Sequence, residues 1–201
     1  MFDSLPDFPL DRRWRSQVFP GPVVVAIIQR ETAVAHSSRP TTPHYLLIRR
    51  NSDAYTGQWA LVGGKWDFGE TLVTAVTREV KEETGLDAAF LALRGLISER
   101  LVPPDQKSPA AHFLIFVCEL SAKGGEASEQ NEGAVAWFSR TEIDALHEQN
   151  VIIPSDYLMI RHFAGTGEFV PHYEAEMLTV LGDKQEHPTR LIRFERINGT
   201  T

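Results

Sequence analysis

Residues 63–86, GGKWDFGETLVTAVTREVKEETGL, combine a glycine-rich loop with an acidic helical pattern. Thr71 is a suitable N-cap, because its hydroxyl can accept a hydrogen bond from an otherwise unpaired amide of the first helical turn. Gly85 suits the left-handed position that follows a helix, and Leu86 can pack back as in a Schellman motif. The stretch therefore predicts a helix over 71–84 with both ends specified, preceded by a loop that glycines bracket.

An apolar stripe follows this helix at a spacing of four residues: Leu72, Val76 and Val80. Glu79, Glu82 and Glu83 are spaced i, i+3, i+4, so their carboxylates gather on one face. At about 100° per residue, Glu83 falls within the apolar stripe rather than opposite it. Carboxylates held this close repel one another and require cations, and hard divalent ions suit such oxygen ligands best.

The alternative is a solvated acidic helix face whose charge Arg78 and Lys81 compensate. Nine positions with the offsets G-x5-E-x7-R-E-apolar-x-E-E-x-G-apolar favour the metal site: Gly64, Glu70, Arg78, Glu79, Val80, Glu82, Glu83, Gly85 and Leu86. Seven of these are specified residues, each with a usage of about one in twenty, so chance coincidence at a given start is negligible. The stretch is a complete Nudix box, and the chain resembles a Nudix hydrolase.

This resemblance covers about residues 20–163 and implies a single α/β domain, an α/β/α sandwich with a mixed β-sheet between helices. Residues 1–19 are expected to form an irregular N-terminal arm. Residues 164–201 form a C-terminal extension, in which 174–181 and 189–197 alternate and predict a β-hairpin. Strands are expected at 22–28 (apolar on both alternations, hence covered on both faces), 44–50, 58–62, 90–102 with a break near 94–95, 110–120 and 134–139. Helices are expected at 141–147, with Thr141 as N-cap, and at 155–163.

The resemblance also implies metal-dependent hydrolysis of a diphosphate linkage that joins a nucleoside to another group, X. The group X distinguishes nucleoside triphosphates, nucleotide sugars such as ADP-ribose, and dinucleotides, and the sequence does not decide among them. Mg²⁺ is the expected ion and Mn²⁺ a frequent substitute. Glu79 and Glu83 are the expected principal ligands, Glu82 shares a second ion, and the backbone carbonyl of Gly64 completes the set.

Further roles follow from the same resemblance. Arg78 is expected to orient a carboxylate of the box, and Glu70 to tie the loop to the helix. A glutamate just ahead of the strand at 134–139 joins the metal site in several family members, and Glu132 matches that place best, with Glu129 in reserve. The general base is either Glu79 or Glu132.

Two pairs of side chains near the box carry open interpretations. Arg49 and Arg50, at the end of a predicted strand, are expected near the box loop, where one of them could bind substrate phosphate. Trp66 and Phe68 lie within the loop itself. They either anchor the loop to the core or stack on a nucleobase.

Composition sets the remaining expectations. The chain has 201 residues, 42% of them hydrophobic and 23% charged, which is typical of a globular protein. A net charge of −7 argues against nucleic acid or an anionic membrane as a partner. The single cysteine, Cys118, lies in an apolar run and is expected to be a buried thiol.

With no signal-peptide pattern and no long apolar run, the cytoplasm is the expected compartment. A homodimer is a further expectation that the sequence leaves open. The rival class, a Nudix-like regulator that binds a nucleotide without hydrolysing it, would need an appended DNA-reading helix that the β-like extension does not offer.

Overall fold

The computed structural model describes residues 19–32, 42–51, 55–102, 111–123, 125–130, 133–178 and 190–197. Its elements in chain order are β1 Gly21–Thr32, β2 Thr42–Arg49, β3 Trp59–Lys65, α2 Leu72–Thr84, β4 Ala88–Leu101, β5 Ala111–Ala122, β6 Val135–Ser139, α3 Arg140–Glu148, α4 Pro154–Phe163, β7 His172–Leu178 and β8 Arg190–Ile197. The predicted strands and helices are all present, with bounds that differ by a few residues.

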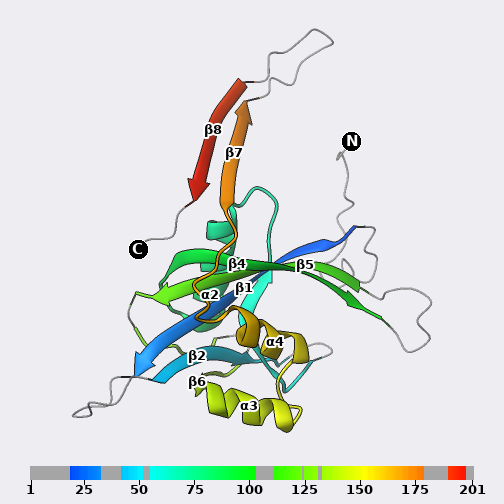
Figure 1. Ribbon diagram of the computed structural model, residues 1–201, viewed down its shortest axis with the longest axis vertical. Coiled ribbons are helices and arrows are strands. Elements are labelled where there is room, and N and C mark those ends of the chain that lie inside the picture. Colours follow the sequence, from blue (N-terminus) through cyan, green and yellow to red (C-terminus); the bar gives the residue numbers. More distant parts are fainter. Residues whose placement is uncertain are drawn as a thin grey trace.

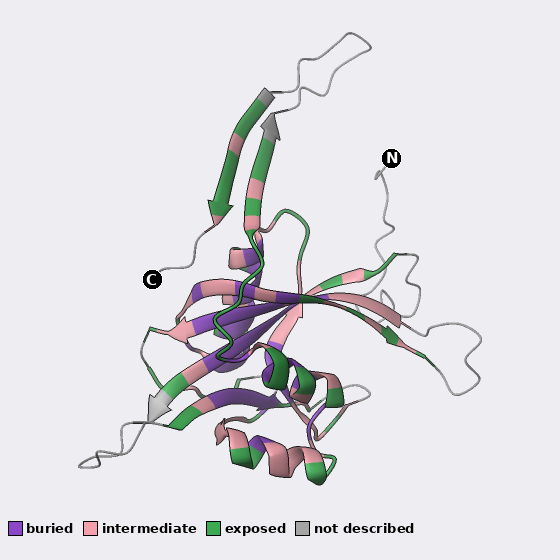
Figure 2. Ribbon diagram, viewed as in Figure 1, coloured by how far each residue is buried: buried purple, intermediate pink, exposed green. Residues whose placement is uncertain are grey.

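A six-stranded mixed sheet in the order β4-β5-β1-β3-β2-β6 forms the centre of the molecule (Figure 1). The helix α2 packs on one face of this sheet, and α3 and α4 pack on the other. β1 is parallel to β5 and antiparallel to β3, and its residues 24–28 are buried from both sides, as its apolar sequence predicted. The predicted α/β/α sandwich is confirmed. Figure 2 shows the buried residues concentrated in these central strands and in the helix faces that cover them.

The end of β3 differs from the prediction. β3 continues through Gly63 and Gly64 to Lys65, whereas the sequence predicted a strand that ends three residues earlier, at Val62, and a loop that begins at the glycines. Gly63 pairs with Val25 and Gly64 with Val24 of β1. A Cβ on Gly63 would overlap the backbone oxygen of Val24, so glycine allows a close approach that any larger residue would prevent. The first glycines of the box therefore lie on a strand in the interior of the sheet.

The start of α3 also differs. Ser139, not Thr141, is the N-cap, and Ser139 and Glu142 form a complete capping box. The amide and hydroxyl of Ser139 donate hydrogen bonds to the Glu142 carboxylate and hold the pKa of that carboxyl below its usual value. The S-x-x-E spacing was readable in the sequence, but the preceding predicted strand had already included Ser139.

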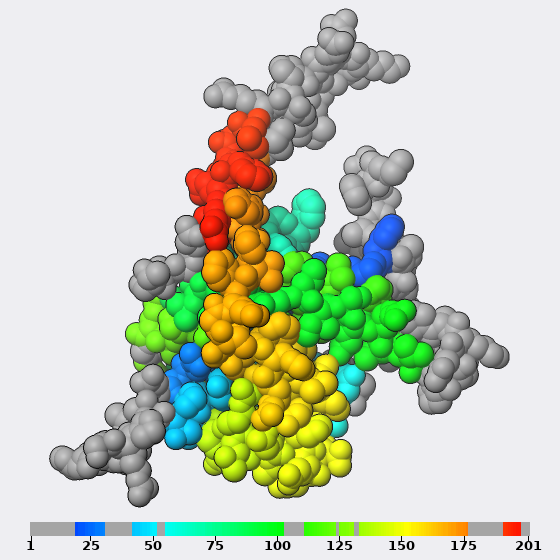
Figure 3. Space-filling view, viewed as in Figure 1, coloured from blue at the N-terminus to red at the C-terminus, as the bar shows by residue number. Residues whose placement is uncertain are grey.

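The C-terminal extension forms the predicted hairpin. β7 and β8 pair only with each other within the described residues and project from the body of the molecule (Figures 1 and 3). The segment that leads to the hairpin is fixed on β4, where the amide of Val170 donates to the carbonyl of Leu93 at 2.7 Å. Arg94 also donates to the carbonyl of Glu168 at 2.5 Å and forms an ion pair with Glu119, which is buried in β5. A register shift in β4 between residues 93 and 95 accompanies this anchor, at the break that the sequence predicted.

Two further features concern the single cysteine and the apolar character of the helices. Cys118 is fully buried in the core, and burial raises the pKa of its thiol, as expected for a structural cysteine. Within the described ranges, none of the helices has both the length and the apolar character needed to span a membrane.

A buried carboxyl connects α4 to β3. Trp59 exchanges backbone hydrogen bonds with Val151 and Ile153, so the segment before α4 runs beside the first residue of β3. The helix α4 then begins, and among the described residues its backbone no longer pairs with β3. The next contact is made by a side chain, because the Asp156 carboxylate accepts a hydrogen bond from the amide of Leu61 at 2.7 Å. Burial raises the pKa of Asp156 to about 7, although the hydrogen bond from Leu61 opposes the shift.

This carboxyl should make stability depend on pH. Because the folded-state pKa lies above the unfolded value, the stabilisation from neutral Asp156 is complete below about pH 4 and is lost as pH rises through 7. In Asp156→Asn the amide oxygen can still accept from Leu61, but nothing titrates at this position. From pH 5 to 8, we expect the free energy of unfolding of the wild type to fall relative to that of Asp156→Asn by roughly 2–4 kcal/mol, measured by urea denaturation. Parallel pH profiles for the two proteins would show that Asp156 does not titrate in this range.

Candidate active site

The helix α2 places two glutamates in its sheet-facing stripe. Glu79 and Glu83 are 9% and 3% exposed and lie among the apolar residues that pack on the sheet. The predicted position of Glu83 within the apolar stripe is thus confirmed, and Glu79 shares it. Both predicted ends of the helix are also confirmed, since Thr71 accepts from the amide of Thr74 and Gly85 adopts the left-handed conformation.

Each buried glutamate lies against one glycine of β3. The amide of Gly63 donates to the Glu83 carboxylate at 2.9 Å. A Cβ on Gly64 would lie 2.6 Å from both carboxylate oxygens of Glu79, so the absence of a side chain at Gly64 is what makes room for that carboxylate. Two anionic groups in a mostly apolar layer are costly unless cations or hydrogen-bond donors compensate them.

Arg78 is the centre of the charge network. Its guanidinium donates to both oxygens of Glu70, with Nε–Oε1 at 2.8 Å and Nη2–Oε2 at 2.9 Å. These bonds hold the pKa of the Glu70 carboxyl below its usual value and raise the pKa of Arg78. Arg78 also donates to the carbonyl of Lys65 at 3.0 Å. Loop and helix are thereby joined through one bidentate ion pair.

The remaining donor of Arg78 reaches the acidic face. Nη1 donates to Glu79 at 2.8 Å and to Glu82 at 3.2 Å. The Glu82 side chain is 60% exposed, so it lies at the edge of the site and not in its interior. One guanidinium therefore contacts two of the three carboxylates and fixes the direction of Glu79.

The donor set fits a hard divalent cation. The residues present are carboxylates on adjacent turns of a helix, backed by the backbone of a strand, and oxygen is the ligand type that Mg²⁺ prefers. In the part of the chain that the structure describes, no three His, Cys, Asp or Glu side chains converge on one point. To bind one cation, the carboxylates would have to turn toward each other. Glu79 would then direct one oxygen to the cation instead of to Arg78.

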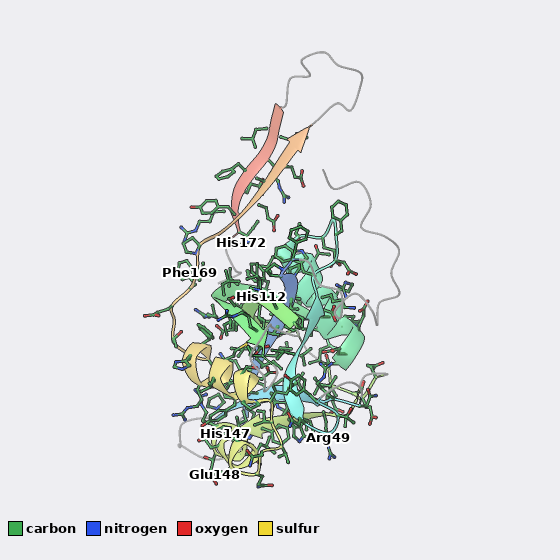
Figure 4. The ribbon with its side chains drawn as sticks, turned by 90° about the vertical axis from the view of Figure 1, so that its right-hand side faces the viewer. Arg49, His112, His147, Glu148, Phe169 and His172 are labelled. Atoms are coloured by element: carbon green, nitrogen blue, oxygen red, sulfur yellow. The ribbon has the colours of Figure 1, made fainter. Side chains whose placement is uncertain are left out.

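The other predicted site residues are placed differently. Arg49 pairs with Trp59 at the start of β3, while Gly64 lies five residues further along that strand, or about 16 Å at the usual rise. The Arg49 side chain is exposed and donates to the carbonyl of Gly57 (Figure 4). Arg50 follows directly, near Asp156. The structure therefore does not bring this pair to the box glutamates.

The acidic loop before β6 is described only in part. Glu132, the predicted additional metal ligand or base, lies outside the described residues. Glu129, its reserve, is exposed.

The two aromatic residues of the box loop have different surroundings. Trp66 donates to the carbonyl of Glu70 at 3.0 Å and packs edge-on against Phe116, with ring centroids 5.0 Å apart. Trp66 therefore anchors the loop to the core, which is the first of the two interpretations from the sequence; the second was stacking on a nucleobase. Phe68 is fully exposed, so it makes no such anchor.

One contact to α2 was not foreseen. The carboxylate of Glu174 in β7 accepts a hydrogen bond from the amide of Leu72, the first residue of the helix. The two residues are 102 positions apart. No local pattern in the sequence could have joined them.

A hollow of about 810 Å³ lies along the outer side of α2, bordered by Thr74, Thr77 and Lys123. Of the polar network described above, only Arg78 borders it among the described residues. The buried glutamates face the opposite side of the helix, so this hollow is not the site that they form.

Comparison with known proteins agrees with this arrangement. The family model for the NUDIX domain matches residues 22–159. The chain is 30% identical over 148 residues to the ADP-ribose pyrophosphatase of Methanocaldococcus jannaschii, covering 73% of the chain and 78% of that protein. It is 30% identical over 110 residues to the nucleoside triphosphatase NudI of Enterobacter sp., covering 51% of the chain and 77% of that protein. Among solved structures, a NUDIX hydrolase from Nitrosomonas europaea has the same fold, with a TM-score of 0.59 at 21% identity over 75% of the chain and 93% of that structure.

The mixed sheet between helices and the complete box of residues 64–86 together point to the class of Nudix hydrolases. The match over residues 22–159 shows that the chain belongs to the NUDIX family. The predicted enzyme class, a hydrolase of phosphoanhydrides, is confirmed at the level of this family.

The contact between Gly64 and Glu79 can be tested by adding one methyl group. In Gly64→Ala the backbone conformation is accessible to alanine, but the methyl group would displace the Glu79 carboxylate. We expect hydrolysis to fall by roughly tenfold to a hundredfold, as for an active-site group moved by about 1 Å. The control is Val170→Ile, which adds one carbon atom to a side chain that is 41% exposed and lies outside the box. Equal Mn²⁺ affinity and activity in Gly64→Ala and the wild type would contradict this role of Gly64.

Proposed function

We propose that the protein hydrolyses the diphosphate linkage of a nucleoside diphosphate joined to a group X, with Mg²⁺ bound at the acidic face of α2. The observation that carries the proposal is the pairing of two buried carboxylates, Glu79 and Glu83, with the glycines of β3. A diphosphate repels an attacking hydroxide through its own negative charge. Bound Mg²⁺ neutralises that charge and lowers the pKa of bound water.

The chain's own residues would divide the work as follows. Glu83 and Glu79 are the principal ligands, and the amide of Gly63 holds Glu83 in direction. Glu82, being exposed, is suited to an ion that arrives with the substrate. The carbonyl of Gly64 is the backbone ligand.

Arg78 has a positioning role in this proposal. Its bidentate bond to Glu70 fixes the guanidinium, and the fixed guanidinium then directs Glu79 and Glu82. The raised pKa of Arg78 keeps the guanidinium charged throughout the range in which the enzyme could act. The general base is Glu79 or Glu132, which activates water for attack on phosphorus. The bridging oxygen leaves with one phosphate, so the products are a nucleotide and phosphorylated X.

For the substrate, we propose a nucleotide sugar of the ADP-ribose type as the first candidate. The support is the relative from M. jannaschii, whose similarity extends over 73% of the chain. Nucleoside triphosphates are the second candidate, supported by the similarity to a nucleoside triphosphatase over 51% of the chain. The start of β3, where Arg49 and Arg50 lie, is about 16 Å from Gly64, so these arginines could contact only the far end of an extended substrate.

A panel of nucleotide diphosphates, assayed with Mg²⁺ and with Mn²⁺, tests this proposal. ADP-ribose, the nucleoside triphosphates and a dinucleoside polyphosphate represent the three substrate types. We expect Glu83→Gln to lose activity on the best substrate by at least about a hundredfold, because a ligand to the catalytic ion is lost.

The matched control for this substitution is Glu148→Gln, at the exposed end of α3 (Figure 4). It should retain wild-type activity, and both variants should show the wild-type circular dichroism spectrum. Hydrolysis by Glu83→Gln at the wild-type rate would refute the metal assignment. Tight binding of one nucleotide without turnover would instead favour the non-hydrolysing regulator.

A further inference from the structure

The first turn of α2 depends on a residue from the C-terminal extension. The helix contains no acidic residue in its first turn, although its positive end favours a negative charge there. Thr71 satisfies the amide of Thr74, and Glu174 of β7 satisfies the amide of Leu72 at 3.3 Å. The extension thus supplies both a hydrogen-bond acceptor and the carboxylate that the helix itself lacks.

Glu174 is held in place by its own strand. His172 contacts the same carboxylate oxygen at 2.9 Å, and the two side chains are only 15% and 17% exposed. Figure 4 shows His172 at the foot of the hairpin, where the hairpin meets the body of the molecule. A partly shielded carboxylate at a helix end interacts more strongly than an exposed one.

The foot of the hairpin is fixed independently of Glu174. Val170 and Glu168 are hydrogen-bonded to β4, and Ile197 at the end of β8 packs against the core cluster that contains the buried stripe of α2. The family model ends at residue 159. The contact to α2 therefore comes from a part of the chain beyond the region that defines the family.

We infer that Glu174 is a positioning residue, through which the C-terminal extension holds the start of α2 and the box loop that precedes it. This inference rests on the proposed function for its effect on catalysis. The start of α2 adjoins Glu70, whose bond to Arg78 directs Glu79. A loosened first turn would therefore change the alignment of the metal ligands without removing any of them.

Hydrogen exchange and kinetics together test the inference. In Glu174→Ala we expect the amides of residues 72–75 to exchange about fivefold to tenfold faster, as for the loss of a helix cap. We expect kcat on the best substrate to fall by about threefold to tenfold, with KM changed less than twofold. Glu174→Gln keeps an acceptor but loses the charge, so its values should lie between those of Glu174→Ala and the wild type; it also replaces the alanine variant if that variant does not fold.

The control is Glu176→Ala on the same strand, where the side chain is 57% exposed and lies 3.8 Å from Arg193. It should match the wild type in both measurements. Unchanged exchange in Glu174→Ala would overturn the inference. Faster exchange with unchanged kcat would also overturn it, because Glu174 would then serve stability alone. Hydrogen exchange requires no substrate, so a failure of the proposed function would appear separately, as no turnover by the wild type.

Discussion

The packing of α2 against the glycine pair of β3 is the constraint on which the rest of the site depends. A helix normally contacts a sheet through apolar side chains alone, yet here Glu79 and Glu83 lie in the contact surface. Two anions are tolerated there because Gly63 contributes an amide donor and Gly64 contributes space. Those glycines can do so only because they belong to a strand fixed between its neighbours in the sheet.

Charge compensation extends this constraint to the loop. Arg78 contacts Glu70, Glu79 and Glu82, so its guanidinium connects the loop, the buried layer and the exposed edge of the helix. Along α2 itself, three glutamates outnumber the two basic residues, Arg78 and Lys81. A divalent ion can compensate this excess of negative charge. The fold therefore favours metal-dependent chemistry at this helix.

Local patterns in the sequence predicted much of this. The ends of α2, the position of Glu83 in the apolar stripe and the break in β4 all follow from neighbours within a few residues, and the structure bears them out. The continuation of β3 through Gly63 could not be read in this way, because it depends on the approach of β1. The contact from Glu174 to Leu72 was beyond reach for the same reason, since it joins residues 102 positions apart. The position of Arg49 and Arg50, away from the box glutamates, was not predicted either. It depends on the register between β2 and β3, which the pattern of a single strand does not determine.

We propose that the buried carboxylates of α2 bind the catalytic ion. Anomalous diffraction from crystals grown with Mn²⁺ tests it most directly, because the metal is then located without reference to activity. We expect an anomalous peak about 2.1–2.3 Å from carboxylate oxygens of Glu79 and Glu83 and close to the backbone of Gly64. A protein that binds Mn²⁺ elsewhere, with Glu83 still accepting its bond from Gly63 and Glu79 still held by Arg78, would contradict it.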